Sequence, residues 1–101
     1  MIEPTKDYES GERRTKADIL FDILRIVQQN QGRAKTTKIL YGANLSYARL
    51  KKYVDYLVQN NFLERQDANG SAIFAITDKG LDFIQQFRKV KKFSEAFGIS
   101  I

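Results

Sequence analysis

The spacing of the apolar residues changes twice along this chain, and this limits its possible folds more than any other feature. From about residue 15 to residue 60, apolar side chains recur at the intervals of amphipathic helices. Around Asn69-Gly70 they follow a strand pattern, and Asn-Gly favours the positive φ angles of a tight hairpin. Helical spacing returns after residue 77. The sequence therefore predicts an α+β fold that is mostly α, with one hairpin.

The first predicted helix follows a polar segment. Residues 1–12 have little apolar content and are expected to form a flexible acidic arm. Thr15 is the expected N-cap, with Asp18 completing a capping box. The helix should reach about residue 30, where Gln31-Gly32 ends it. Its expected buried face consists of Ile19, Leu20, Ile23, Leu24, Ile26 and Val27.

A short helix and a longer helix follow, separated by a tight turn. The short helix is expected over about 36–41, and Gly42 is the residue expected to stop it. Ser46 is the expected N-cap of the longer helix, which should end at Asn60-Asn61. The buried stripe of that helix is expected to be Leu50, Tyr53, Val54 and Leu57. A short helix, a glycine-containing turn and a longer basic helix form a helix-turn-helix.

A hairpin comes directly after the helix-turn-helix. Strands are predicted over 62–66 and 71–76, joined by a turn over 67–70. Thr77-Asp78 should then cap a last helix. The predicted fold is therefore a winged helix-turn-helix with a two-stranded wing and a C-terminal dimerisation helix.

The last helix is the predicted dimer interface. Phe83, Phe87 and Val90 follow heptad spacing, which is typical of helices that pair with a second helix. The chain thus divides into three predicted segments: the arm (1–12), the winged helix-turn-helix domain (13–78), and the C-terminal helix and tail (79–101).

Composition argues against several classes of protein. The chain has no cysteine and no histidine, so thiolate metal sites and the commonest general base near neutral pH are both missing. We expect no enzyme, no cofactor and no metal. No apolar run approaches the roughly 20 residues that a membrane span needs, and the acidic N-terminus is unlike a signal peptide. The expected location is the cytoplasm, in association with the nucleoid.

Positive charge is concentrated outside the first twelve residues. The formal net charge is +5, with −3 on residues 1–12 and +8 on residues 13–101. Residues 33–52 contain six basic residues and no acidic one. A field of one sign attracts polyanions, chiefly nucleic acid or an anionic membrane surface, although a solvated basic face is the alternative.

The N-terminal half of a recognition helix contacts base edges in the major groove. With Leu50 facing the core, Lys51 and Lys52 should point outward, and Arg49 should lie on one flank. Lysine and arginine can donate to guanine or to phosphate, and tyrosine and serine hydroxyls can reach phosphate. The candidate DNA contacts are Arg33, Lys35, Lys38, Ser46, Tyr47, Arg49, Lys51 and Lys52.

Other candidate sites have two interpretations each. The wing residues Arg65, Asn69 and Gly70 could contact the minor groove, or the hairpin could only cover the core. Tyr41 and Tyr47 could be partly buried or exposed to DNA, whereas Tyr53 is expected in the core. The second basic cluster could contact DNA, but it is interpreted as a solubilising face of the dimerisation helix; it consists of Arg88, Lys89, Lys91 and Lys92.

The sequence resembles small archaeal winged-helix DNA-binding proteins. The resemblance lies in residues 35–47, in Leu50, in Lys52-Tyr53 and in the Thr-x-Lys-Gly step at 77–80. That family includes regulators and chromatin-type proteins, some of which dimerise through a long C-terminal coiled coil. The present chain departs there, because its last helix is short.

The residue pattern and the resemblance to archaeal winged-helix proteins together predict a homodimeric transcriptional regulator. It is expected to bind double-stranded DNA and no membrane. An architectural, chromatin-type role and a winged helix used for protein–protein interaction are the alternatives. The acidic arm could also fold over the basic face and compete with DNA. An enzyme is the weakest hypothesis, because no nucleophile–base pair or phosphate-binding glycine loop is present.

Overall fold

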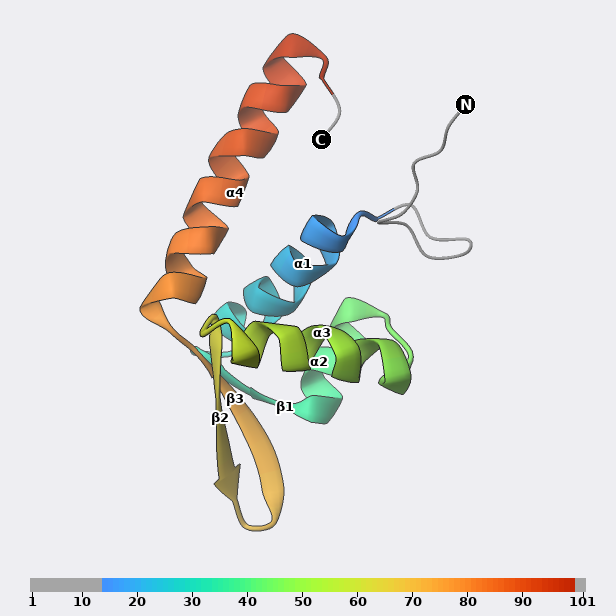
Figure 1. The fold of residues 1–101 in the computed structure, drawn as a ribbon, viewed down its shortest axis with the longest axis vertical. Coiled ribbons are helices and arrows are strands. Elements are labelled where there is room, and N and C mark those ends of the chain that lie inside the picture. Colours follow the sequence, from blue (N-terminus) through green and yellow to red (C-terminus); the bar gives the residue numbers. More distant parts are fainter. Residues whose placement is uncertain (1–13, 100–101) are drawn as a thin grey trace.

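The computed structural model describes residues 14–99 as one α+β domain with a projecting last helix (Figure 1). The predicted acidic arm, residues 1–12, lies outside the described residues. In chain order the elements are α1 (Lys16–Gln29), β1 (Arg33–Lys35), α2 (Thr36–Ala43), α3 (Tyr47–Gln59), β2 (Leu63–Ala68), β3 (Ser71–Ile76) and α4 (Asp78–Phe97). The three strands form an antiparallel sheet in the order β1-β3-β2.

Helix α1 confirms the prediction made from its capping residues. The Thr15 hydroxyl accepts a hydrogen bond from the Asp18 amide, and the Asp18 carboxylate accepts one from the Thr15 amide. All six apolar residues predicted for its inner face are buried. Asn30 caps the helix, and Gln31 and Gly32 then adopt positive φ angles of 65° and 83° that reverse the chain.

Helix α2 is longer than predicted because Gly42 does not stop it. The helix continues to Ala43, and Asn44 takes the left-handed cap conformation with a φ of 55°. Gly42 has a packing role instead, since a Cβ atom there would lie 2.9 Å from Ile26 Cδ1. The glycine therefore permits the close approach of α2 to α1.

Strand β1 is an element that the sequence did not predict, and it adds a third strand to the hairpin. Ala34 lies opposite Phe74, and both are buried. Arg33 and Lys35 lie opposite Ala75 and Ile73 and are exposed. A three-residue strand is too short to give a periodic signal, and its pairing with β3 is a long-range contact.

Helix α3 and the hairpin match the prediction closely. Ser46 and Asn60 cap α3, and its four predicted core residues are buried. Strand β3 has the predicted bounds, whereas β2 starts one residue later and extends to Ala68. The turn is therefore limited to Asn69 and Gly70, whose φ angles of 53° and 79° are those of a tight two-residue hairpin loop.

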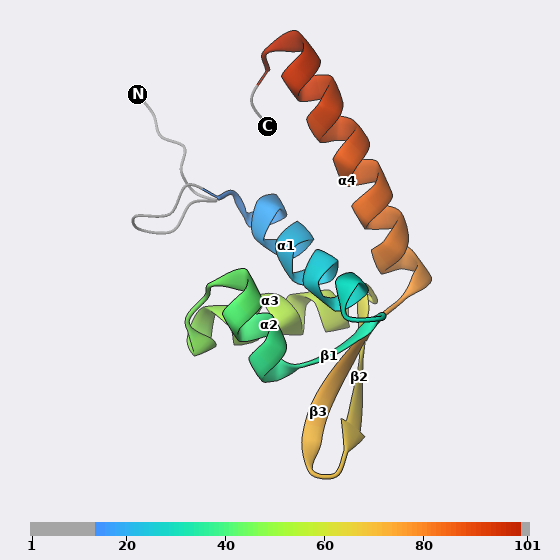
Figure 2. The same cartoon turned by 180° about the vertical axis from the view of Figure 1, so that it is seen from behind.

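Helix α4 begins at the predicted cap and packs on α1 through aromatic rings. The Thr77 hydroxyl accepts from the Gly80 amide. Phe87 stacks on Phe21 and on Phe83, at centroid distances of 4.8 Å and 5.6 Å. The C-terminal half of α4 extends beyond the rest of the domain, as both ribbon views show (Figures 1 and 2). No helix within residues 14–99 is long and apolar enough to cross a membrane.

Candidate nucleic-acid interface

The turn between α2 and α3 sets the start of the exposed basic helix. Asn44 reverses the chain in the left-handed conformation, and Leu45 is buried beneath the turn. The Ser46 hydroxyl then accepts a hydrogen bond from the Arg49 amide at 3.3 Å. This is the capping bond that the sequence predicts for Ser46.

Arg14 fixes this turn from the start of α1. Its Nη1 donates to the Ala43 carbonyl at 2.8 Å, and Nη2 donates to the Asn44 carbonyl at 3.4 Å. Nη1 also pairs with an Asp22 carboxylate oxygen at 3.1 Å. The sequence gives no local signal for this role of Arg14, because its contact spans 29 residues.

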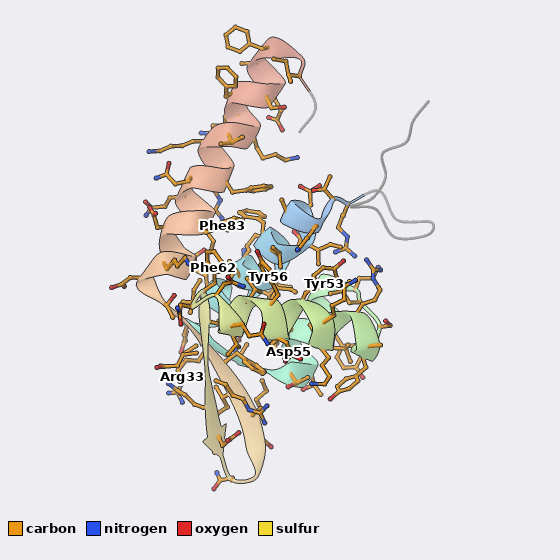
Figure 3. The ribbon with its side chains drawn as sticks, viewed as in Figure 1. Arg33, Tyr53, Asp55, Tyr56, Phe62 and Phe83 are labelled. Carbon is orange, nitrogen blue, oxygen red and sulfur yellow. The ribbon has the colours of Figure 1, made fainter. Side chains whose placement is uncertain are left out.

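The outward face of α3 carries the side chains predicted to meet DNA. Lys51 and Lys52 are exposed, whereas Leu50 and Tyr53 on the inner face are 1% and 3% exposed. The sequence left open whether Tyr47 is partly buried or exposed, and in the structure it is 63% exposed. Arg49 is half-buried on the flank of the helix. Figure 3 labels Asp55, Tyr53 and Tyr56 along this helix and shows Tyr53 and Tyr56 on the side toward α1.

Two acidic residues balance part of the charge near α3. Lys51 Nζ pairs with Asp55 Oδ2 at 3.2 Å, one helical turn along α3. On the wing, Arg65 Nε pairs with Asp67 Oδ1 at 3.3 Å. The wing tip, Asn69 and Gly70, is exposed. Beside α3 the wing therefore presents a balanced charge pair rather than a second basic surface.

Three other predicted DNA contacts lie apart from the outward face of α3. Arg33 and Lys35 project from β1, and Lys38 projects from the first turn of α2. These residues line an open groove together with Arg25 of α1, and no α3 residue is among the described residues that line it. Figure 3 shows Arg33 beside the sheet, away from the labelled residues of α3.

The predicted dimer stripe on α4 is divided by packing within the chain. Phe83 and Phe87 stack on each other and contact Phe62 and Phe21 respectively. Val90 is 48% exposed. Two further large apolar side chains are exposed beyond it, Phe93 and Phe97, whose rings lie 4.8 Å apart. Phe93 lies outside the heptad positions counted from Phe83, so the heptad pattern does not predict its place in this surface.

The described residues offer no metal site: within 14–99 there is no group of three or more histidine, cysteine, aspartate or glutamate residues that could hold an ion.

Comparison with known proteins gives consistent matches. A family model described as winged helix-turn-helix matches residues 13–95. Sso10a-2, a DNA-binding protein from Sulfolobus solfataricus, has a crystal structure that superposes with a TM-score of 0.76 at 31% identity, covering 83% of this chain and 85% of that one.

Two uncharacterized proteins of Methanocaldococcus jannaschii are also similar in sequence. MJ0290 is 32% identical over 78 residues, covering 77% of this chain and 34% of that protein. MJ0287 is 31% identical over 68 residues, covering 67% of this chain and 64% of that protein. The chain thus spans about a third of one relative and just under two thirds of the other.

Proposed function

The chain belongs to the winged helix-turn-helix family, and from that premise we propose that it binds duplex DNA through α3 and acts as a homodimeric transcriptional regulator. The observation that carries this proposal is the outward face of α3, where Tyr47, Lys51 and Lys52 are exposed on a helix whose other face is core. The major groove of B-DNA admits one α-helix, and lysine side chains there donate to guanine O6 and N7 or to phosphate.

The residues of α3 have different roles in this proposal. Lys51 and Lys52 reach base edges and phosphates, and the Tyr47 hydroxyl donates to a phosphate. Arg49 lies half-buried on the flank of the helix, and Ser46 first serves the helix as its cap. At the wing, Arg65, Asn69 and Gly70 face the minor groove.

The 31% identity to Sso10a-2, a DNA-binding protein, supports duplex DNA as the partner.

The exposed apolar residues of α4 support a homodimer. We assign residues 13–78 to DNA binding and residues 79–101 to dimerisation, with Val90, Phe93 and Phe97 at the contact. Exposed apolar side chains grouped on a projecting helix mark an interaction surface. Phe83 and Phe87 form the base of this surface through their stack on α1. A symmetric dimer presents two α3 helices to two half-sites.

The first test is an anisotropy titration of labelled random-sequence duplex DNA across a salt series. The wild-type protein should lose affinity linearly in log salt, with a slope of about −0.9 for each neutralised phosphate. Lys51→Glu/Lys52→Glu should weaken binding by about a hundredfold or more, because two cations become anions at the DNA surface. The matched control is Lys89→Glu/Lys92→Glu, which makes the same charge change on α4. Equal binding by wild type and the α3 variant would contradict the proposal.

Regulation and architecture differ in the ratio of specific to non-specific affinity. Selection from a random library should give a site that binds about a thousandfold or more tightly than random duplex, which is the range of site-specific proteins. A ratio near one would favour the architectural role and leave DNA binding itself intact.

A further inference from the structure

An open basic groove lies between α1, β1 and α2, with a volume of about 1140 Å³. Viewed from behind, these three elements lie toward the reader and α3 lies beyond them (Figure 2). Arg25, Arg33, Lys35 and Lys38 line the groove. Among the described residues that line it, none is acidic and none belongs to α3. The groove is therefore a second positive surface, separate from the outward face of α3.

Local backbone geometry explains why these cations gather there. Side chains alternate between the two faces of a strand, so the buried Ala34 of β1 leaves Arg33 and Lys35 on the outer face together. On α2, Lys38 and Tyr41 are three residues apart and lie on one side of the helix. The outer face of β1 and the outer side of α2 form two adjoining walls of the groove.

The charge in this groove is available to a partner. Arg33, Lys35 and Lys38 form no ion pair with any residue in 14–99, whereas Lys51 and Arg65 each pair with an aspartate. Arg25 contributes less, because it lies 3.7 Å from an Asp22 carboxylate oxygen. Three cations that have neither an ion-pair partner nor a neighbouring acid within residues 14–99 favour an anionic ligand.

The N-terminus of α2 adds to the same field. Its first turn holds no acidic residue, and its N-cap, Lys35, makes no side-chain hydrogen bond to the helix. The first amides of a helix carry a partial positive charge and bind phosphate readily. Lys35, Thr37 and Lys38 place this first turn in the wall of the groove.

We propose that the groove binds the phosphate backbone of a second DNA duplex, distinct from the duplex that α3 contacts. The inference rests on the proposed function of α3. A wide and open groove fits an extended polyanion better than a small anion, which would stay in water there. Tyr41, 80% exposed in the wall, offers a hydroxyl to phosphate. A second duplex is favoured because the elements that line the groove, α1, β1 and α2, lie behind α3 in one ribbon view and in front of it in the other (Figures 1 and 2).

The test is a titration of the ¹⁵N-labelled full chain with a short duplex of about one helical turn, followed by amide chemical shifts. Lys51 and Lys52 should shift in a first step that saturates at one duplex per protomer. Arg33, Lys38 and Tyr41 should shift in a second, weaker step as more duplex is added. If groove and α3 amides move in a single step, or the groove amides never move, the second site does not exist.

Charge-reversal variants separate this proposal from the one for α3. Arg33→Glu/Lys38→Glu should weaken the second step by about tenfold or more while the first step changes by no more than about twofold. Lys51→Glu/Lys52→Glu should do the reverse, and Lys89→Glu/Lys92→Glu should preserve both steps. Loss of the first step in the groove variant would show that the groove contacts the same duplex as α3. If only the groove variant loses DNA binding, the role of α3 is wrong and the groove is the sole site.

Discussion

At the scale of single residues, Asp55 limits the charge that α3 offers to DNA. Its carboxylate holds Lys51 at 3.2 Å on an exposed surface, where such a pair contributes only about 0.3–0.5 kcal/mol to stability. A phosphate that approaches Lys51 must displace this carboxylate. In the proposed complex Asp55 therefore lowers the affinity for DNA, while its contact within the helix is weak.

Asp55→Asn should therefore strengthen DNA binding. Removing one negative charge beside the phosphates should raise the affinity roughly two- to fivefold at low salt, and less at high salt because the effect is screened. Anisotropy titration measures the change. Asp82→Asn is the control, since Asp82 also accepts a hydrogen bond one turn along its helix but lies on α4. If both variants strengthen binding equally, the change in net charge explains the effect, and the position of Asp55 beside Lys51 does not.

Arg14 is the residue on which the helix-turn-helix turn depends. Arg14→Ala removes its bonds to two carbonyl oxygens and its ion pair with Asp22. The free energy of unfolding should fall by about 1–3 kcal/mol, because the part-buried Ala43 carbonyl loses a charged donor. Urea denaturation followed by circular dichroism measures this loss.

Arg14→Lys provides the matched control for that experiment. Lysine keeps the positive charge near Asp22 but lacks the planar fork that reaches two carbonyl groups at once. Its stability should lie between those of wild type and Arg14→Ala. A lysine variant as stable as wild type would show that charge alone matters at this position.

At the scale of elements, the packing of helices relies on glycine at two places. A Cβ atom on Gly80 of α4 would lie 2.5 Å from the Phe62 carbonyl oxygen, which is backbone and cannot move aside easily. At Gly42 of α2 the nearest atom would be Ile26 Cδ1, the end of a side chain. The two positions therefore tolerate a methyl group differently.

Gly80→Ala should destabilise the protein by about 1–3 kcal/mol, as overpacking typically does. Gly42→Ala should cost less, since Ile26 can change its rotamer and alanine is the better helix former. Thermal denaturation of the two variants gives the ranking. A larger loss for Gly42→Ala would show that the contact between α1 and α2 is the more rigid of the two.

The same elements show what the sequence could predict. Local signals sufficed for α1, α3 and the hairpin, because Thr15, Ser46 and Asn69-Gly70 act on residues next to them. Gly42 was misjudged because its reason lies in Ile26 of another helix. The pairing of β1 with β3 and the bonds of Arg14 are likewise contacts between distant segments, and they leave no periodic trace in the sequence.

For the candidate site, the sequence predicted which side chains of α3 are exposed, but it did not predict where β1 and α2 place their cations. Helical periodicity correctly placed Lys51 and Lys52 outward and Tyr53 inward. Lys35 and Lys38 were predicted at the start of the preceding helix, as phosphate contacts beside α3, and their contact with DNA stays a prediction. In the structure, strand β1 and helix α2 direct them into a groove that no described residue of α3 lines.

At the scale of the whole molecule, α4 would keep the proposed dimer contact apart from the proposed DNA-binding face. Its first half is held to α1 by the Phe21–Phe87 stack, and its second half exposes Val90, Phe93 and Phe97. These three residues lie three and four positions apart, which puts them on one side of the helix. A second copy that covers this stripe would leave α3 of each protomer open to DNA.

Val90→Asp/Phe97→Asp should convert the proposed dimer into a folded monomer. Placing two carboxylates in an apolar contact costs their desolvation, whereas in the monomer both positions face water. Sedimentation velocity should show about half the wild-type mass, with an unchanged circular dichroism spectrum. Gln85→Asp/Ala96→Asp adds the same charge to other exposed positions of α4 and should remain dimeric.

The monomeric variant also links the assembly to DNA binding. A dimer binds two half-sites in one event, so the second contact gains from a high effective concentration. The variant should bind a single half-site as well as wild type does and lose about tenfold or more on a two-half-site duplex. Equal affinity of both proteins for the longer duplex would mean that each protomer acts alone on DNA, whatever its state in solution.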